Sequence, residues 1–152
     1  VASQMSGPGA AQALSGDHVR VRVAEGNEFT CKTRYRGRGH LLQYWRSMPL
    51  HQPSVFWSRE VYEKVGPLRE DLHLIMDYEY WLRISEHYEF LNVERVLSYS
   101  HQHSAAKTGN SYEGYDAERR KLSQELIAGE PWLERMRYGF ALWRHRVRTG
   151  RD

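Results

Sequence analysis

Between His18 and Ser85 the apolar residues change their spacing from that of a strand to that of a helix, which limits the folds open to the chain. Residues 18–23 alternate valine with arginine, the period of a half-buried strand. Residues 77–85 instead carry apolar side chains three and four positions apart, as on one face of a helix. Short strand patterns recur at 55–57 and 90–99. The sequence therefore predicts an α/β fold with a few strands flanked by helices.

The amino-acid composition narrows the class of protein further. With 152 residues, 40% of them hydrophobic and 27% charged, the chain suits one compact domain and is too apolar for a disordered protein. A single cysteine, Cys31, excludes an internal disulfide and a four-cysteine zinc module. No apolar run reaches the length of a membrane span, and no secretory signal opens the chain. We therefore expect a cytoplasmic protein, either free or peripheral to the membrane.

Composition and charge divide the chain into three parts. Residues 1–17 are small, rich in glycine and almost uncharged, so we expect a flexible lead-in there. Residues 18–130 hold the strand and helix patterns, and over 51–130 nine basic residues face fourteen acidic ones. Residues 131–152 are basic, with six basic and two acidic residues, and form a predicted helix behind Pro131. This basic end is either a solvated helix or a contact for phosphates or an anionic membrane surface.

Turn and capping residues mark most of the predicted elements. Strands are expected at 18–23 and 29–35, joined by a turn at 25–27. Ser58 is expected to cap a helix that Gly66 ends, with Val61, Tyr62 and Val65 on its inner face. A second helix begins at Asp77. Charged helices are expected at 115–128 and 131–148.

Asp77 is the first residue that could carry chemistry. A carboxylate at a helix start, beside wide aromatic side chains, could act as a general base toward a bound hydroxyl. Ordinary helix capping explains the same residue, and Tyr80 and Trp81 are equally suited to a hydrophobic core. Spacing alone favours capping for Asp77 and the core for the two aromatic residues.

Two further groups could bind ligands. His101 and His103 would lie on one face of an extended segment, where they could share a divalent ion or simply be surface histidines. The polar loop 104–109 carries one cation, Lys107, and could close over a phosphate, although it lacks the spacing of a P-loop.

Taken together, residues 51–83, HQPSVFWSREVYEKVGPLREDLHLIMDYEYWLR, resemble the acceptor-side half of the family 2 nucleotide-sugar glycosyltransferases. Those enzymes have a GT-A fold, in which a "qPsvFwrrevyekvG" segment and a later "mDyelWlR" segment carry the acceptor pocket and the base. The likeness continues to a histidine followed by Lys-Thr, met here by His103 and Lys107-Thr108, and covers about half of the chain.

The resemblance implies a role for each matching residue. Asp77 would deprotonate the acceptor hydroxyl. Tyr78 and Trp81 would shape the acceptor site, and Gln52 and Ser54 would line its floor. His103 would lie near a divalent ion, Mg²⁺ or Mn²⁺, that belongs to the complete enzyme, with Lys107 on the loop that closes over the donor diphosphate.

The chain departs from the family pattern in three ways. Met76 stands where the family usually has an acidic residue, and His101 where it commonly has an arginine. No Asp-x-Asp is present, and about 50 residues precede Gln52, too few for the nucleotide-binding βαβ half. We therefore expect a partial GT-A-like fold that does not catalyse transfer by itself and that exposes core surface through which it dimerises.

The resulting hypothesis is the C-terminal portion of an inverting glycosyltransferase, which transfers a sugar from a nucleotide-diphosphate sugar to a hydroxyl acceptor such as a growing saccharide. The alternative is a non-catalytic module, derived from such an enzyme, that binds a saccharide or a partner. A nucleic-acid binder using the basic end is a third class, but no nucleic-acid motif supports it, so we expect no nucleic-acid partner.

Overall fold

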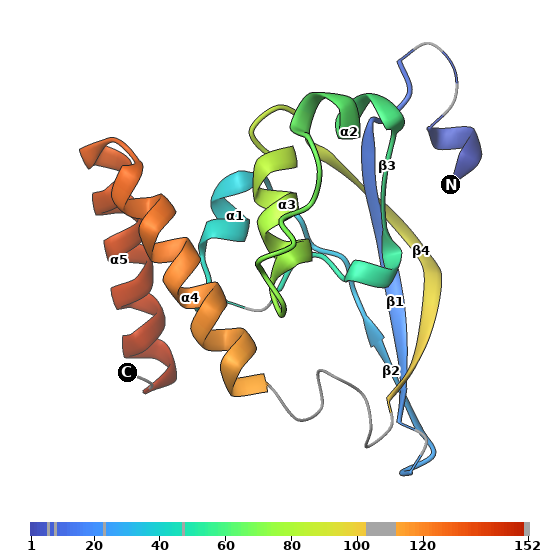
Figure 1. The fold of residues 1–152 in the computed structure, drawn as a ribbon. Coiled ribbons are helices and arrows are strands. Elements are labelled where there is room, and N and C mark those ends of the chain that lie inside the picture. Colours follow the sequence, from blue (N-terminus) through green and yellow to red (C-terminus); the bar gives the residue numbers. More distant parts are fainter. Residues whose placement is uncertain (6, 8, 23, 47, 103–111, 151–152) are drawn as a thin grey trace.

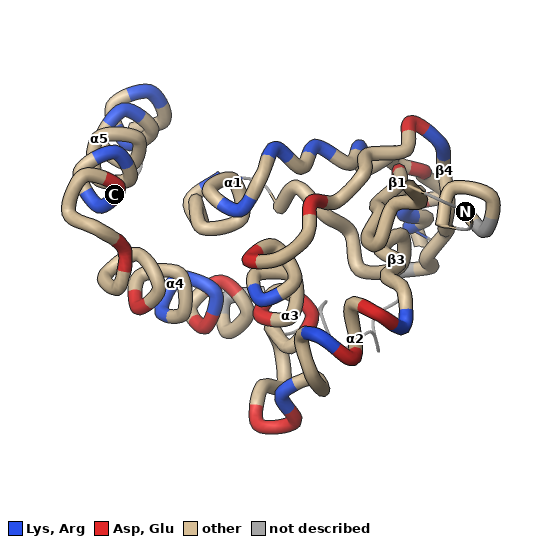
Figure 2. Tube along the Cα trace, turned by 90° about the horizontal axis from the view of Figure 1, so that it is seen from above, with Lys and Arg blue, Asp and Glu red and all other residues tan. Residues whose placement is uncertain are grey.

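The structure is a computed structural model that describes residues 1–5, 7, 9–22, 24–46, 48–102 and 112–150. Over these residues the fold is mixed α/β, with a four-stranded sheet on one side and helices on the other (Figure 1). The α/β class expected from the sequence is confirmed. The C-terminal helices α4 and α5 lie farthest from the sheet (Figures 1 and 2).

The central strand of the sheet is β1, Ala13–Arg22. Strand β4, Phe90–Gln102, runs parallel to it along its whole length. The other edge of β1 is shared by two antiparallel strands. The first half of β1 pairs with β3, Val55–Trp57, and the second half with β2, Asn27–Cys31. This arrangement places distant parts of the sequence side by side.

A glycine allows β4 to approach β1 closely. The register between the two strands shifts on either side of Asp17. A Cβ atom on Gly16 would lie 2.4 Å from the Leu97 Cγ and 2.9 Å from the carbonyl oxygen of Arg95. Any larger residue would have to displace β4, so the glycine is required by packing.

The predicted lead-in, residues 1–17, is too long. Strand β1 begins at Ala13, and the side chains of 13–19 are all buried. Its small residues suit a central strand because β4 packs closely against them, whereas by composition alone they are typical of a linker. Before β1 lies a short 3-10 helix, η1, Ala2–Gln4. The predicted strand at 29–35 is likewise shifted, since β2 ends at Cys31.

Three short α-helices and a 3-10 turn connect the strands. They are α1, Arg38–Leu42; η2, Gln52–Ser54; α2, Arg59–Val65; and α3, Met76–Ile84. The predicted Ser58 cap is confirmed, because its hydroxyl accepts a hydrogen bond from the Val61 N–H at 3.3 Å. Gly66 ends α2 with a positive φ of 85°, also as predicted. Tyr62, expected on the inner face, is exposed instead.

The core lies between the sheet and helices α1, α2 and α3. Its members are aromatic and aliphatic side chains from all of these elements, with the largest contribution from α3. Its most completely enclosed large side chains are Leu41, Leu42, Leu50, Val61, Ile75, Tyr78, Tyr80, Leu82 and Ile84.

Two long helices form a hairpin at the edge of the molecule. Helix α4 spans Tyr112–Gly129 and helix α5 spans Trp132–Thr149, directly after Pro131. Both agree with the sequence expectation to within a few residues. Basic residues prevail along α5, whereas α4 carries both signs of charge (Figure 2). Within the described ranges, none of the helices combines the length and apolar character needed to cross a bilayer.

Candidate functional site

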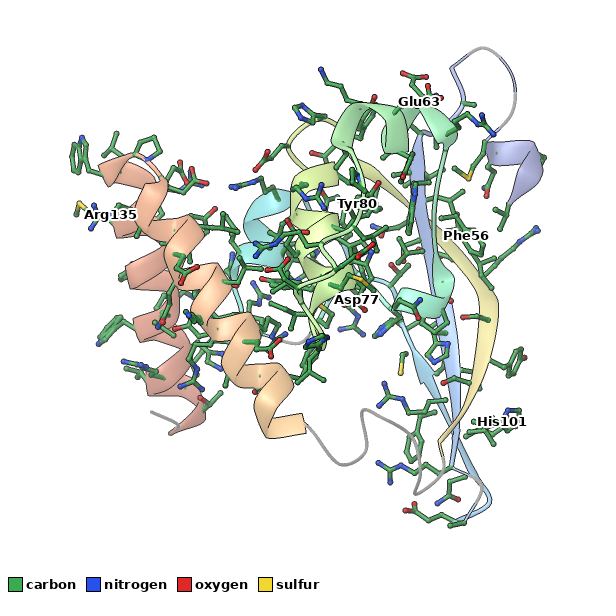
Figure 3. All side chains as sticks on the ribbon, viewed as in Figure 1. Phe56, Glu63, Asp77, Tyr80, His101 and Arg135 are labelled. Carbon is green, nitrogen blue, oxygen red and sulfur yellow. The ribbon has the colours of Figure 1, made fainter. Side chains whose placement is uncertain are left out.

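Asp77 lies in the first turn of α3 (Figure 3). Its Oδ1 accepts a hydrogen bond from the Tyr78 N–H at 2.7 Å. Burial raises the pKa of its carboxyl, and hydrogen bonds from the backbone N–H groups of Tyr78 and of Asp77 itself oppose that shift. With the described residues it makes no ion pair. A carboxylate in this state accepts a proton more readily than an exposed aspartate does.

The start of α4 borders Asp77. The pKa of Tyr115 is raised, chiefly by burial and next by the negative charge of Asp77. One residue earlier, a Cβ on Gly114 would lie 3.2 Å from Leu74 Cδ1, in the segment that leads into α3. The start of α4 therefore lies near the start of α3, where Asp77 is. His103 and Lys107, which the sequence assigned to metal and substrate binding, lie outside the described residues.

The resemblance implies that Tyr78 and Trp81 shape the acceptor site, but neither side chain is exposed. Tyr78 is fully buried, and its hydroxyl donates to the Leu41 carbonyl oxygen at 2.7 Å and lies 2.6 Å from the Ser123 hydroxyl. Trp81 is 2% exposed and belongs to the core. The structure thus corrects this expectation: both rings hold α3 in place, and neither offers a face to a sugar.

Arg83, at the end of the same motif, fixes the helix to the segment before it. Its guanidinium binds both carboxylate oxygens of Glu79, at 2.7 and 3.0 Å. It also donates to the carbonyl oxygens of Val65 and Pro67, each at 2.9 Å. The bidentate pair with the buried Glu79 fixes the guanidinium, and its bonds to Val65 and Pro67 hold α3 against the end of α2. The motif therefore holds Asp77 in a fixed position through its neighbours.

Gln52 and Ser54 are both expected on the floor of the acceptor site, but they differ in solvent exposure. Gln52 is exposed on η2. Ser54 is fully buried, donates to the Asp17 carbonyl oxygen at 2.9 Å and is hydrogen-bonded to the Ser98 hydroxyl. Ser54 therefore ties η2 to the sheet and does not line an open floor.

A buried polar cluster on the sheet was missed by sequence reasoning. Asp17 is 3% exposed, and its carboxylate accepts hydrogen bonds from the Lys32 ammonium at 2.7 Å and from the Thr33 N–H at 3.0 Å. A signal was available, because Ser-Gly-Asp-His directly precedes an alternating strand pattern. The small, glycine-rich composition of residues 1–17 places Asp17 in a lead-in, whereas the structure has it in the central strand β1.

His18 extends this cluster. Its ring nitrogens lie 2.9 Å from the Ser98 hydroxyl and 2.8 Å from the Ser100 hydroxyl, two residues apart on one face of β4. The His51 ring lies 6.1 Å away, between ring centroids. Burial is the main cause of a lowered pKa in both histidines, so both are neutral near pH 7. The neutral His18 ring and the hydroxyls of Ser98 and Ser100 satisfy one another.

Metal binding finds no support within the part of the chain that the structure describes. That part holds no group of three or more histidine, cysteine, aspartate or glutamate side chains placed to share an ion. His101 lies exposed on β4 (Figure 3). Its predicted partner, His103, belongs to the segment that is not described, so the pair stays a prediction.

A hollow of about 600 Å³ opens between α4, α5 and the segment after α1. Aromatic side chains of Tyr44, Trp45 and Trp132 line it, together with Arg135 and several aliphatic groups. Its residues on α4 begin at Gln124, nine positions after Tyr115, which is about 14 Å along a helix. The hollow and Asp77 are therefore separate features of the molecule.

Comparison with known proteins leaves the family open. No protein-family model matches the chain, and no curated protein and no solved structure matches it either.

Proposed function

We propose that this chain is the acceptor-side portion of an inverting family 2 glycosyltransferase, with Asp77 as the base that takes the proton of the acceptor hydroxyl. The proposal rests on the resemblance of residues 51–83 and on one structural observation. Asp77 is a partly buried carboxylate whose pKa is raised by burial, and backbone N–H groups hold it. The proposal includes the cytoplasmic location and saccharide acceptor expected from the sequence.

In the proposed reaction the acceptor oxygen forms a bond to the anomeric carbon of the donor sugar. The bond from that carbon to the diphosphate breaks, and the nucleoside diphosphate leaves with the electron pair. The hydroxyl proton passes to Asp77. Arg83 and Tyr78 contribute by positioning, since their hydrogen bonds fix the helix that carries the carboxylate.

The divalent ion that the resemblance implies does not fit the described residues, which offer no set of three ligands. What this chain supplies in the proposal is the base and its rigid support.

The test is the substitution Asp77→Asn in the longest reading frame that contains this chain. Asparagine keeps the shape of the side chain but cannot accept the proton, so turnover should fall about 10²–10⁴-fold. Release of nucleoside diphosphate measures turnover, and calorimetry with the nucleotide sugar should give unchanged donor binding.

Asp71→Asn is the matched control, because it removes the same charge from an exposed site where Asp71 pairs with Arg69. It should leave turnover unchanged. If the Asp77 variant turns over as fast as this control, Asp77 is not the base and the proposed mechanism fails.

The second candidate, a non-catalytic binding module, is favoured by the hollow between α4 and α5. Aromatic faces suit sugar rings, and Trp132 is 65% exposed at its rim. For such a module, calorimetry should detect oligosaccharide binding that Trp132→Ala weakens and Asp77→Asn leaves unchanged. Nucleotide sugars should then not bind.

A further inference from the structure

The outward face of α5 is apolar and uncovered. None of the residues of this helix, all of which the structure describes, is buried. Its outward side chains are 58–65% exposed: Leu133, Met136, Phe140, Trp143 and Val147. Their alternating spacing of three and four residues places them in one stripe along the helix. The opposite side packs inward, where Tyr138 contacts the core. The stripe therefore has no partner among the described residues.

Arginines border this stripe on both sides. At about 100° per residue, Arg137, Arg144 and Arg148 follow one margin and Arg146 lies beyond the other, while Arg135 lines the hollow between α4 and α5. Helix α5 carries these five arginines against one glutamate, Glu134, which pairs with Arg137 at 2.6 Å. The remaining four make no ion pair with a described residue. The margins of the stripe are therefore strongly positive.

We propose that α5 docks on an anionic lipid bilayer, lying in the plane of the membrane surface. The apolar stripe would enter the boundary between headgroups and acyl chains, and the arginines would contact lipid phosphates. Aromatic and aliphatic residues on one face with basic residues beside them are the features of helices that bind in this way. Helix α5 forms the outer edge of the molecule, where it is accessible to a flat surface (Figure 1).

The charge beside the stripe favours an anionic bilayer over a second copy of the chain as the partner of α5. The stripe has the spacing of a helix-pairing seam, but its flanking positions carry Arg137, Arg144 and Arg146. Pairing two copies would bring these positive charges together, with Glu134 as the one acidic residue of each α5 to offset them. A plane of phosphates instead offers negative charge beyond both margins of the stripe at once. An acidic groove on another protein would match one narrow surface and is an outcome of the test.

The experiment is flotation of the intact chain with lipid vesicles, and it does not depend on the proposed glycosyltransferase activity. Vesicles of phosphatidylcholine with phosphatidylglycerol should carry the chain upward, whereas vesicles of phosphatidylcholine alone should not. High salt should release the chain, because ions screen the attraction between arginine and phosphate.

Two pairs of variants test the two parts of the surface. Phe140→Ser with Trp143→Ser should lower vesicle affinity at least about tenfold, because exposed apolar area is lost. Arg144→Glu with Arg148→Glu should also lower it at least about tenfold. The matched controls lie on other elements: Phe29→Ser with Tyr99→Ser, and Arg59→Glu with Arg95→Glu. Both controls should bind as the wild type does. Circular dichroism should give the same helix content for every variant.

Three results would overturn the proposal. The first is no flotation with anionic vesicles even at low ionic strength. The second is equal loss of binding in the α5 variants and the controls, which would mean general attraction of a basic protein. The third is that α5 binds another protein surface and the chain does not float with vesicles. Dimers in sedimentation equilibrium that Trp143→Ser dissociates would identify a second copy of the chain as the partner. Retention of the chain by a polyglutamate peptide would identify an acidic protein.

Discussion

Helices α3 and α5 use the same kinds of residue for opposite purposes. Both combine aromatic side chains and arginine at helical spacing. Six of the nine residues of α3 are buried, whereas none of the eighteen in α5 is. Arg83 on α3 binds a buried glutamate and two carbonyl groups, while most arginines of α5 point to solvent. An apolar stripe on a helix therefore does not tell by itself whether it faces the core or a partner.

The physical difference lies in what surrounds each helix. Helix α3 packs against the core, so its apolar side chains from Tyr78 onward lose contact with water on folding, whereas Met76 at its start stays exposed. Helix α5 packs on one side only, chiefly on α4. Substitutions should therefore reduce stability in α3 and change binding in α5.

The largest expected contrast is between two leucines. Leu82 on α3 is 2% exposed and Leu133 on α5 is 58% exposed. Leu82→Ala should lower the free energy of unfolding by about 2–5 kcal/mol, because it leaves a cavity in the core. Leu133→Ala should change it by less than about 0.5 kcal/mol. Urea denaturation measures both, and equal losses would mean that α5 is also part of the core.

A second contrast concerns arginines. Arg83→Met should lower the free energy of unfolding by about 2 kcal/mol, because it leaves the buried Glu79 and two carbonyl groups without their donor. Arg148→Met, in the last turn of α5, should leave stability nearly unchanged. Thermal unfolding of both variants compares them, and an unaffected Arg83 variant would contradict its role as a clamp.

A smaller loss of stability is expected when the Tyr78 hydroxyl is removed. Tyr78→Phe removes the hydrogen bonds to the Leu41 carbonyl oxygen and the Ser123 hydroxyl, which should cost about 1 kcal/mol. Tyr99→Phe is the control, because Tyr99 is 63% exposed on β4. Denaturant unfolding should separate the two variants. If they are equally stable, the hydroxyl does not tie α3 to its neighbours.

The smallest change in the free energy of unfolding should come from Asp77→Asn. The sign of this change is what tests the state of the carboxylate. A raised pKa means that the folded state binds the proton more tightly than the unfolded state does. The wild type therefore loses stability as the pH rises through this raised pKa, and Asp77→Asn does not. The variant should be the more stable protein at pH 7.

Below the ordinary aspartate pKa of about 3.9 the difference between the two should disappear. Unfolding at a series of pH values measures the stability difference between the wild type and the variant. NMR titration of the Asp77 carboxyl carbon measures its pKa. A wild type that is more stable than the variant at pH 7 would show that Asp77 acts as a stabilising cap.

Local structure was largely predictable from local residues. Ser58 and Gly66 bound α2 because a hydroxyl satisfies the first N–H groups and a glycine accepts the positive φ that follows. Asp77 in a first turn and Pro131 before the last helix were found for similar reasons. Each of these signals concerns a few neighbouring residues, so no knowledge of the fold was needed.

The lead-in and the candidate site were predicted less well. Nothing within residues 13–17 reveals that β4, more than seventy positions later, covers them. By sequence Tyr78 and Trp81 could serve an acceptor site or a core, and it is the packing of distant segments on α3, such as α1 and α4 at the Tyr78 hydroxyl, that makes them core. The polar cluster of Asp17 and His18 likewise needs Lys32 and the serines of β4 before its burial makes sense.

By itself the sequence determined the α/β class, the caps and turns of the helices, and the concentration of arginine at the C-terminal end. Tertiary structure decided which apolar stripe became core, which carboxylate was enclosed and which was paired. The reason is that burial is a property of contacts between distant segments. Periodicity and capping, in contrast, depend on residues only a turn apart.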